Sequence, residues 1–209
     1  AGQCLDCKAW NTLEEVVISQ ATASKPESLQ DLPASKVQYL SEIKSQNKDR
    51  LSTGLTELDR TLGGGLVDGS VVLIGGDPGI GKSTLILQAL SALNKANTTL
   101  YVSGEESAEQ VSERAVRLGI KEDVLFIGET HLEKILKLSK DVQPKVIVID
   151  SIQTMVTDLS TSAPGSVTQV RDCAAQLTQY AKQTNTILLM IGHVTKGGAL
   201  AGPRILEHM

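Results

Sequence analysis

The chain has 209 residues with 20 basic and 24 acidic side chains, which give it a formal net charge of −4 at pH 7. Its longest apolar run, residues 187–191, is far shorter than the roughly 20 residues that span a bilayer, and its three cysteines do not make a disulfide framework, so we expect a cytoplasmic protein without a membrane partner. The acidic balance and the five aromatic residues also argue against a basic, base-stacking coat on nucleic acid.

The first fifty residues separate from the rest of the chain by composition. Residues 1–16 carry Cys4 and Cys7, and residues 17–50 are rich in Ser, Lys, Gln and Glu. A polar segment of this kind is typical of a linker. The sequence therefore predicts a short N-terminal zone, a linker and one folded domain over residues 51–209.

In that domain short apolar runs alternate with segments of helical periodicity. The expected strands are 70–74, 98–103, 124–127, 145–150 and 186–191. Three expected helices begin with a capping box, formed by Ser107 with Gln110, Thr130 with Glu133, and Ser166 with Gln169. Strands that are apolar on both faces and alternate with helices predict an α/β fold, with a mainly parallel sheet covered by helices on both sides.

A glycine-rich loop follows the first of these strands. It matches the pattern G-x-x-x-x-G-K-[ST], and Thr84 continues the expected helix that begins at Lys82. Such a loop directs backbone N–H groups and a helix N-terminus at phosphates, while the lysine contacts the outer phosphates and the serine ligates Mg²⁺. The predicted nucleotide-binding residues are Gly76, Asp77, Pro78, Gly79, Ile80, Gly81, Lys82, Ser83 and Thr84.

Polar side chains close three further strands at the edge of the sheet where α/β ligands bind. Asp150 ends a buried strand and is expected to hold the hydration shell of Mg²⁺, with a helix cap as the alternative. Glu105 and Glu106 follow another strand, where one can act as general base or both can complement a helix dipole. His193 ends the last strand, where it either senses the γ-phosphate or makes a structural hydrogen bond.

The longer motifs resemble a known family. They are T-G-L-T-E-L-D at 53–59, S-G-E-E-S at 103–107, D-S-I-Q-T at 150–154, S-A-P-G-S at 162–166, G-H-V-T-K at 192–196 and A-G-P-R at 201–204. Together with the phosphate loop, they resemble the bacterial RadA (Sms) family of RecA-like ATPases. The resemblance implies a RecA-like P-loop core and a DNA-dependent ATPase of recombinational DNA repair. It also implies a homo-hexameric ring, a branch-migration helicase acting on single-stranded and branched DNA, and a RecA-type recombinase as partner.

The resemblance assigns roles residue by residue. It implies that ATP or ADP binds the phosphate loop with Mg²⁺ at Ser83 and Asp150, and that Glu105 or Glu106 acts as the catalytic base. Lys82 is a further catalytic residue, which contacts the outer phosphates. His193 resembles the switch residue of the sensor strand. Residues 156–165 and 195–203 resemble the two DNA-facing loops, with Lys196 and Arg204 as the candidate DNA-binding residues.

Two departures from the family pattern concern the ends of the sequence. The family begins with two Cys-x-x-Cys pairs, whereas this sequence carries only Cys4 and Cys7. A tetrahedral zinc site needs four ligands, so residues 1–16 are interpreted as a partial zinc-finger remnant that binds Zn²⁺ only in a chain with the missing pair. The family pattern also continues beyond residue 209 with a Lys-Asn-Arg-Phe-Gly motif and a Lon-protease-like domain.

Two other functions remain open at this point. A nucleotide-switched oligomer resembling the clock ATPase KaiC would hydrolyse ATP slowly and regulate partner binding without DNA. Alternatively, residues 1–50 form mainly an arm that docks a partner. Residues 151–209 carry four basic and three acidic side chains, so the part with both candidate DNA loops is slightly positive in an acidic chain. In a ring, a few basic residues per subunit line one channel, which reconciles the acidic balance with DNA binding.

Overall fold

The computed structural model of the chain describes Tyr39 and residues 50–193. The expected linker and N-terminal zone therefore lie almost entirely outside the described residues, as do Cys4 and Cys7. The same is true of Lys196 and Arg204 at the other end. The described part thus corresponds to the predicted domain up to His193.

The core of the domain is one parallel sheet of five strands. The strands are β1 (Val71–Gly76), β2 (Thr99–Ser103), β3 (Leu125–Gly128), β4 (Val146–Asp150) and β5 (Ile187–His193). Their order across the sheet is β1-β5-β4-β2-β3, and every neighbouring pair is parallel. All five expected strands are present within one or two residues of their predicted bounds.

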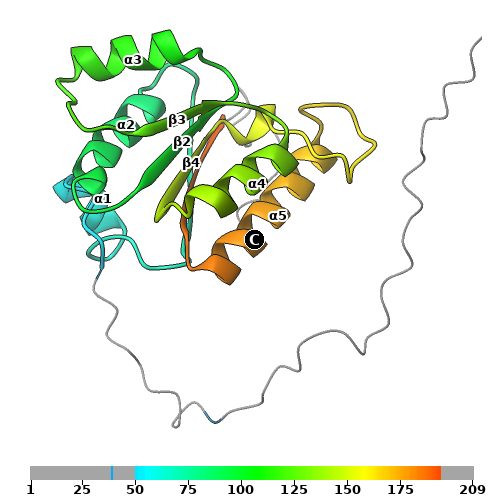
Figure 1. The fold of residues 1–209 in the computed structure, drawn as a ribbon, viewed down its shortest axis with the longest axis horizontal. Coiled ribbons are helices and arrows are strands. Elements are labelled where there is room, and N and C mark those ends of the chain that lie inside the picture. The colour runs from blue at the N-terminus through cyan, green and yellow to red at the C-terminus, as the bar shows by residue number, and fades with distance from the viewer. Residues whose placement is uncertain (1–38, 40–49, 194–209) are drawn as a thin grey trace, which may run out of the picture. The chain divides into compact units, whose positions relative to one another are not determined.

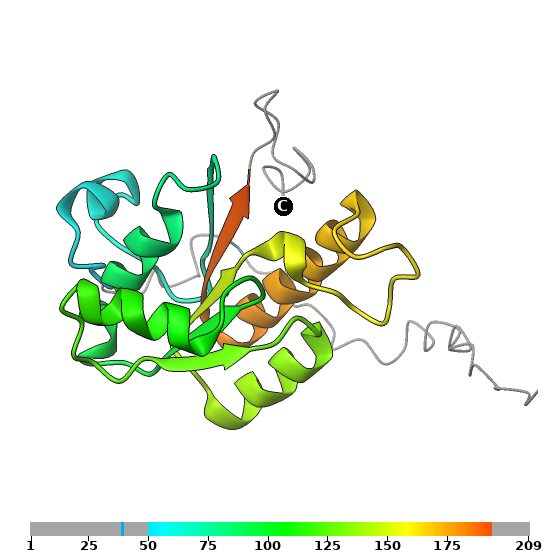
Figure 2. The same cartoon turned by 90° about the horizontal axis from the view of Figure 1, so that it is seen from above.

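Helices cover both faces of this sheet (Figures 1 and 2). They are α1 (Thr56–Thr61), α2 (Lys82–Asn94), α3 (Ala108–Arg117), α4 (Leu132–Val142), α5 (Val167–Thr184) and the 3-10 helix η3 (Ile152–Thr154). One buried cluster joins α2 and α3 to the sheet and the other joins α4 and α5 to its opposite face. The predicted α/β fold, a parallel sheet covered by helices on both sides, is confirmed.

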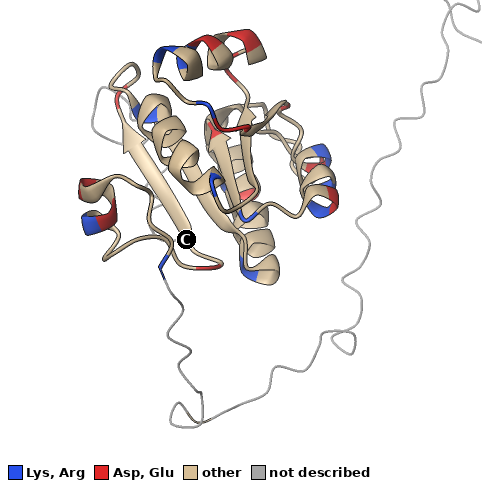
Figure 3. Cartoon of the chain, turned by 60° about the vertical axis from the view of Figure 1, so that its left-hand side comes forward, with Lys and Arg blue, Asp and Glu red and all other residues tan. Residues whose placement is uncertain are grey.

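The strands are apolar on both faces because both faces are covered. Along β4, Val146 and Val148 belong to the cluster under α2, and Ile147 and Ile149 to the cluster under α4 and α5. Within the five strands the one Asp, Glu, Lys or Arg is Asp150, and Figure 3 shows the other charges on helices and loops. A charged group at the end of a buried strand therefore marks the functional edge of this sheet.

Cys173 is a core thiol. Its side chain is fully buried on α5, and burial raises the pKa of the thiol to about 12. A thiol in such surroundings stays protonated and packs as a small apolar group.

No helix among residues 50–193 has the length and apolar character that a membrane span requires.

The helix starts agree only in part with the predicted capping boxes. At α3 both reciprocal bonds form, because Ser107 Oγ accepts from the Gln110 backbone and the Gln110 side chain accepts from the Ser107 backbone. At α5 only the first bond forms, from the Gln169 backbone to Ser166 Oγ. The Gln169 side chain instead bonds residues of the loop before α5.

The capping box predicted for Thr130 and Glu133 is wrong. Helix α4 begins at Leu132 with His131 as its N-cap, and the His131 side chain makes no capping hydrogen bond. The carboxylate of Glu129 instead accepts hydrogen bonds from the His131 and Thr130 backbone N–H groups, and these bonds with that from Lys134 lower its pKa to about 2. Glu133 turns away to accept from Thr157 Oγ1 at 2.6 Å and from the Asp158 backbone.

A pair of alanine substitutions tests this difference. Ser107→Ala should lower the free energy of unfolding by about 1 kcal/mol, because it removes the acceptor for an otherwise unpaired helix N–H group. Thr130→Ala should cost less than about 0.5 kcal/mol, because its hydroxyl caps nothing. Urea unfolding followed by circular dichroism gives both values, and equal losses would contradict the observed helix starts.

Candidate nucleotide site

Four strand ends bring the predicted site residues to one edge of the sheet. The register places Gly76 at the end of β1 opposite His193 at the end of β5, and Ser103 at the end of β2 opposite Asp150 at the end of β4. Strands in a parallel sheet point the same way, so their C-terminal ends share an edge. The phosphate loop, Asp150, Glu105, Glu106 and His193 thus belong to one neighbourhood, as the sequence predicted.

The phosphate loop leads directly from β1 into α2. Gly79 and Gly81 have φ values of 79° and 102°, a left-handed conformation that side chains with a Cβ rarely adopt. Lys82 is 7% exposed, and its ammonium group donates to the carbonyl oxygens of Gly76 and Asp77, both at 2.8 Å. The lysine therefore lies across its own loop, at the position from which it can reach phosphate oxygens.

Asp150 is almost fully buried at the end of β4. Its Oδ2 accepts a hydrogen bond from the hydroxyl of Tyr101, which is itself buried in the middle of β2. Burial and the neighbouring Asp150 carboxylate raise the pKa of Tyr101 far above its ordinary range, so the hydroxyl remains a donor. The peptide bond between Asp150 and Ser151 is cis.

The carboxylate of Glu105 connects three parts of the site. Its Oε1 accepts from Ser151 Oγ at 2.5 Å and lies 3.0 Å from Nε2 of His193. Burial raises the pKa of Glu105, but hydrogen bonds from Ser151 and His193, with the positive charge of Lys82, lower it below its ordinary value. Glu105 is therefore an ionised carboxylate beside the phosphate loop.

Glu106 faces a different set of partners. Its carboxylate forms a close ion pair with Arg114 of α3, whose side chain is 17% exposed. The Ser103 hydroxyl also donates to the Glu106 carbonyl and accepts from the Glu106 N–H, which fixes the turn after β2. The two adjacent carboxylates thus diverge, Glu105 toward Lys82 and His193, and Glu106 toward α3.

His193 connects this edge to the segment after β4. Its carbonyl oxygen accepts from the side chain of Gln153 in η3 at 3.3 Å. Close packing holds η3 in place, because a Cβ added at Gly104 would lie 2.1 Å from Thr154 Oγ1. The sequence patterns assign no role to Gly104 or Ser151. The one local sign of the close packing at Gly104 is a glycine between a strand end and two acidic residues.

Gln169 determines the conformation of the first candidate DNA loop, residues 156–165. Its buried side chain accepts from the Thr157 N–H and donates to the carbonyl oxygens of Thr157, Ser160 and Ser162. Leu159 in the same loop is 77% exposed. The capping prediction is confirmed for the Gln169 backbone, which bonds Ser166, but not for the Gln169 side chain, which bonds a loop up to 12 residues away.

The donor set fits magnesium of the kind that P-loop proteins use. Mg²⁺ retains several waters and takes few protein ligands, all of them oxygens. Ser83 in the first turn of α2 and the buried carboxylate of Asp150 supply such oxygens. Among residues 50–193 there is no cluster of three or more His, Cys, Asp or Glu side chains arranged to hold a metal ion by themselves.

Comparison with known proteins identifies the family. The model of the AAA domain family matches residues 38–199. The DNA repair protein RadA of Pseudomonas aeruginosa is 54% identical over 210 residues, which cover 100% of this chain and 46% of that protein. The RadA proteins of Escherichia coli and Bacillus subtilis are 50% and 47% identical, covering 99% and 100% of this chain and 46% of each relative. The chain thus spans about half the length of the curated relatives that it matches. It belongs to the AAA domain family of RecA-like P-loop ATPases, within the group of bacterial RadA proteins.

Proposed function

We propose that this chain is the ATP-hydrolysing core of a DNA-dependent ATPase of recombinational DNA repair. The observation that carries the proposal is the position of Glu105, an ionised carboxylate hydrogen-bonded to Ser151 and His193 and influenced by the charge of Lys82. A general base must lie within hydrogen-bond reach of the water that it activates, beside the group under attack. The relatives' name, DNA repair protein RadA, supports the biological context.

Each residue then has a chemical role. The backbone N–H groups of residues 76–83 other than Pro78, together with the Lys82 ammonium, would bind the β- and γ-phosphates of ATP. Mg²⁺ bound near Ser83 and Asp150 would neutralise charge that develops on the phosphate oxygens. Glu105 accepts the proton of the attacking water, and Ser151 and His193 hold its carboxylate in place. Glu106, held by Arg114, stabilises the turn rather than acting as the base.

The DNA-facing side of the proposal rests on the two segments that follow β4 and β5 in the sequence. Residues 156–165 follow β4 and η3, and residues 195–203, which lie outside the described part, follow β5. Hydrolysis can reach both loops through Glu105, His193 and Gln153. We propose that Lys196 and Arg204 contact the backbone of single-stranded or branched DNA inside a homo-hexameric ring, which acts as a cytoplasmic branch-migration helicase beside a RecA-type recombinase.

Residues 1–50 enter this proposal as an appendage of the ATPase. We propose that residues 1–16 are a zinc-finger remnant that holds Zn²⁺ only in a chain with a second cysteine pair, and that residues 17–50 are a linker. A partner that still binds after deletion of residues 1–50 would exclude the docking-arm alternative. Loss of that binding would favour it.

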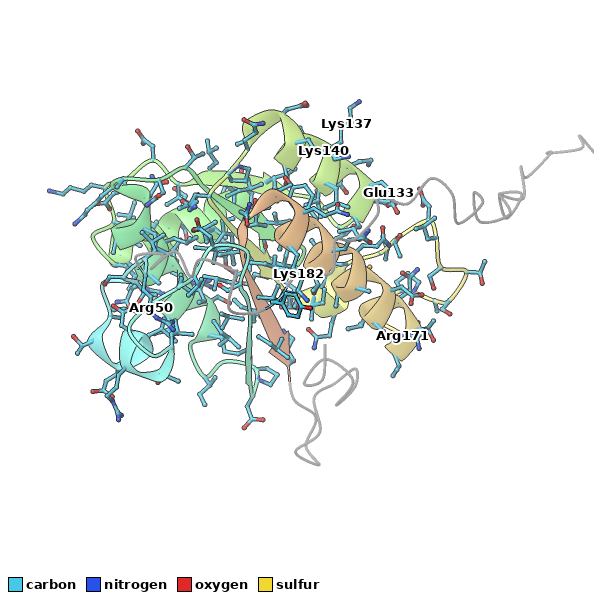
Figure 4. The ribbon with its side chains drawn as sticks, turned by 90° about the horizontal axis from the view of Figure 1, so that it is seen from below. Arg50, Glu133, Lys137, Lys140, Arg171 and Lys182 are labelled. Atoms are coloured by element: carbon cyan, nitrogen blue, oxygen red, sulfur yellow. The ribbon has the colours of Figure 1, made fainter. Side chains whose placement is uncertain are left out.

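The test is ATP turnover with and without single-stranded DNA, in the protein extended to the length of its relatives. We expect DNA to raise the turnover of the unchanged protein and to have no such effect after Lys196→Ala with Arg204→Ala. The matched control is Lys137→Ala with Lys140→Ala, two exposed lysines of α4, labelled in Figure 4, that should leave the stimulation by DNA unchanged. Turnover that ignores DNA in every variant would instead favour the KaiC-like nucleotide switch.

A further inference from the structure

One buried side chain reaches the metal-holding carboxylate from inside the sheet. Tyr101 is 1% exposed and pairs with Val148 across β2 and β4, two residues before Asp150. Alternate residues of a strand share a face, and two residues span roughly 6.6 Å, about the length of a tyrosine side chain. The hydroxyl can therefore reach Oδ2 of Asp150 along the strand, and it donates a hydrogen bond there.

The ring of Tyr101 is fixed by its surroundings. It stacks on Phe126 of β3 with ring centroids 6.3 Å apart and 17° between the planes. It belongs to the buried cluster under α2 and α3. A side chain held in this way presents its hydroxyl at one defined point, and a hydrogen bond to that point restricts the carboxylate that accepts it.

We propose that Tyr101 is a positioning residue for magnesium, because it engages Oδ2 of Asp150 and thereby fixes Oδ1 as the oxygen that serves the hydrated ion. Oδ1 has no hydrogen-bond donor among the residues that the structure describes. The assignment rests on the proposed function, since it needs nucleotide and Mg²⁺ at this edge. Tyr101 lies inside the sheet, and the phosphate-loop pattern does not include it.

The neighbouring ion pair makes this arrangement electrostatically possible. Glu106 lies close enough to influence Tyr101, and Arg114 carries the compensating positive charge. Two carboxylates at one buried edge would otherwise repel each other, and the ion pair with Arg114 offsets the charge of Glu106. Tyr101 and Arg114 thus let Asp150 be both buried and ready for a hydrated cation.

Tyr101→Phe removes only the hydroxyl and keeps the stacked ring. The readout is binding of a fluorescent ADP analogue, measured with excess EDTA and against increasing Mg²⁺. We expect the Mg²⁺ concentration at half effect to rise roughly tenfold, the scale of losing one hydrogen bond to a charged group, with binding in EDTA unchanged. Tyr180→Phe, which removes a hydroxyl from the other buried cluster, should change neither value.

A double-mutant cycle separates positioning from a general structural effect. If Tyr101 acts through Asp150, Tyr101→Phe should not shift the Mg²⁺ dependence further in a chain that already carries Asp150→Ala. The same shift in both backgrounds, or an unchanged Mg²⁺ dependence in Tyr101→Phe alone, would overturn the assignment. Impaired binding in EDTA would also overturn it, because the tyrosine would then support the whole fold. Failure of the unchanged protein to bind ADP would contradict the proposed function itself, and the assignment with it.

Discussion

Glu105→Gln should lower ATP turnover by roughly two to four orders of magnitude, the usual contribution of a positioned general base. The amide has the same size and can still accept a hydrogen bond from Ser151 Oγ, but it cannot take a proton from water. Nucleotide binding should persist, because the proposed mechanism assigns the phosphate contacts to the loop and to Lys82. Steady-state hydrolysis and equilibrium binding of an ATP analogue measure the two effects separately.

The matched control is Glu106→Gln, one residue further along the same turn. It weakens the ion pair with Arg114, so its main effect should be on the free energy of unfolding, with turnover falling less than tenfold. The reverse result, with turnover lost in Glu106→Gln and retained in Glu105→Gln, would move the catalytic role to Glu106. The two substitutions together decide between residues that the sequence alone left equivalent.

The ionisation of Glu105 makes both its availability as a base and the stability of the fold depend on pH. Burial raises its pKa, but the hydrogen bonds from Ser151 and His193 and the charge of Lys82 outweigh that effect, so the folded pKa is lowered. The carboxylate is therefore available as a base above this lowered value. The stability that these bonds contribute is present above the unfolded pKa and is lost as the pH falls through the folded one.

The fold could be predicted because its signals are local. Buried strands such as β4 are continuous apolar runs, and the spacing of the phosphate loop fixes a strand before it and a helix after it. The capping box at Ser107 is likewise complete within four residues. Each of these features is decided by neighbours in the chain, so periodicity and spacing suffice to find it.

The parts of the site that could not be predicted depend on residues far apart in the chain. The bond from Tyr101 to Asp150 spans 49 positions, that from Ser151 to Glu105 spans 46, and the His193–Glu105 contact spans 88. The Thr130 prediction was wrong for the same reason, because Glu133 is drawn to Thr157, 24 positions away. Tertiary contacts of this kind decide which partner a polar side chain bonds, and local sequence patterns do not contain that information.

Lys82→Ala should abolish detectable ATP hydrolysis and leave the fold intact. The lysine lies buried at the base of an exposed loop, where its ammonium group contacts only the carbonyl oxygens of Gly76 and Asp77 among the described residues. Water can satisfy those carbonyls in the variant, so the free energy of unfolding should fall by only about 1 kcal/mol. The triphosphate, by contrast, loses the positive charge of the lysine, which stabilises the phosphate oxygens as negative charge develops on them.

Far-ultraviolet circular dichroism, thermal unfolding and steady-state hydrolysis measure these effects in one preparation. Lys95→Ala is the matched control, because Lys95 follows the other end of α2, and its side chain is 69% exposed. It should preserve both turnover and stability. A Lys82→Ala chain that unfolds would show that the lysine supports the core rather than the ligand. A folded variant that still hydrolyses ATP would show that the phosphates are neutralised by another group, and the loop would then lose its central role in the proposed mechanism.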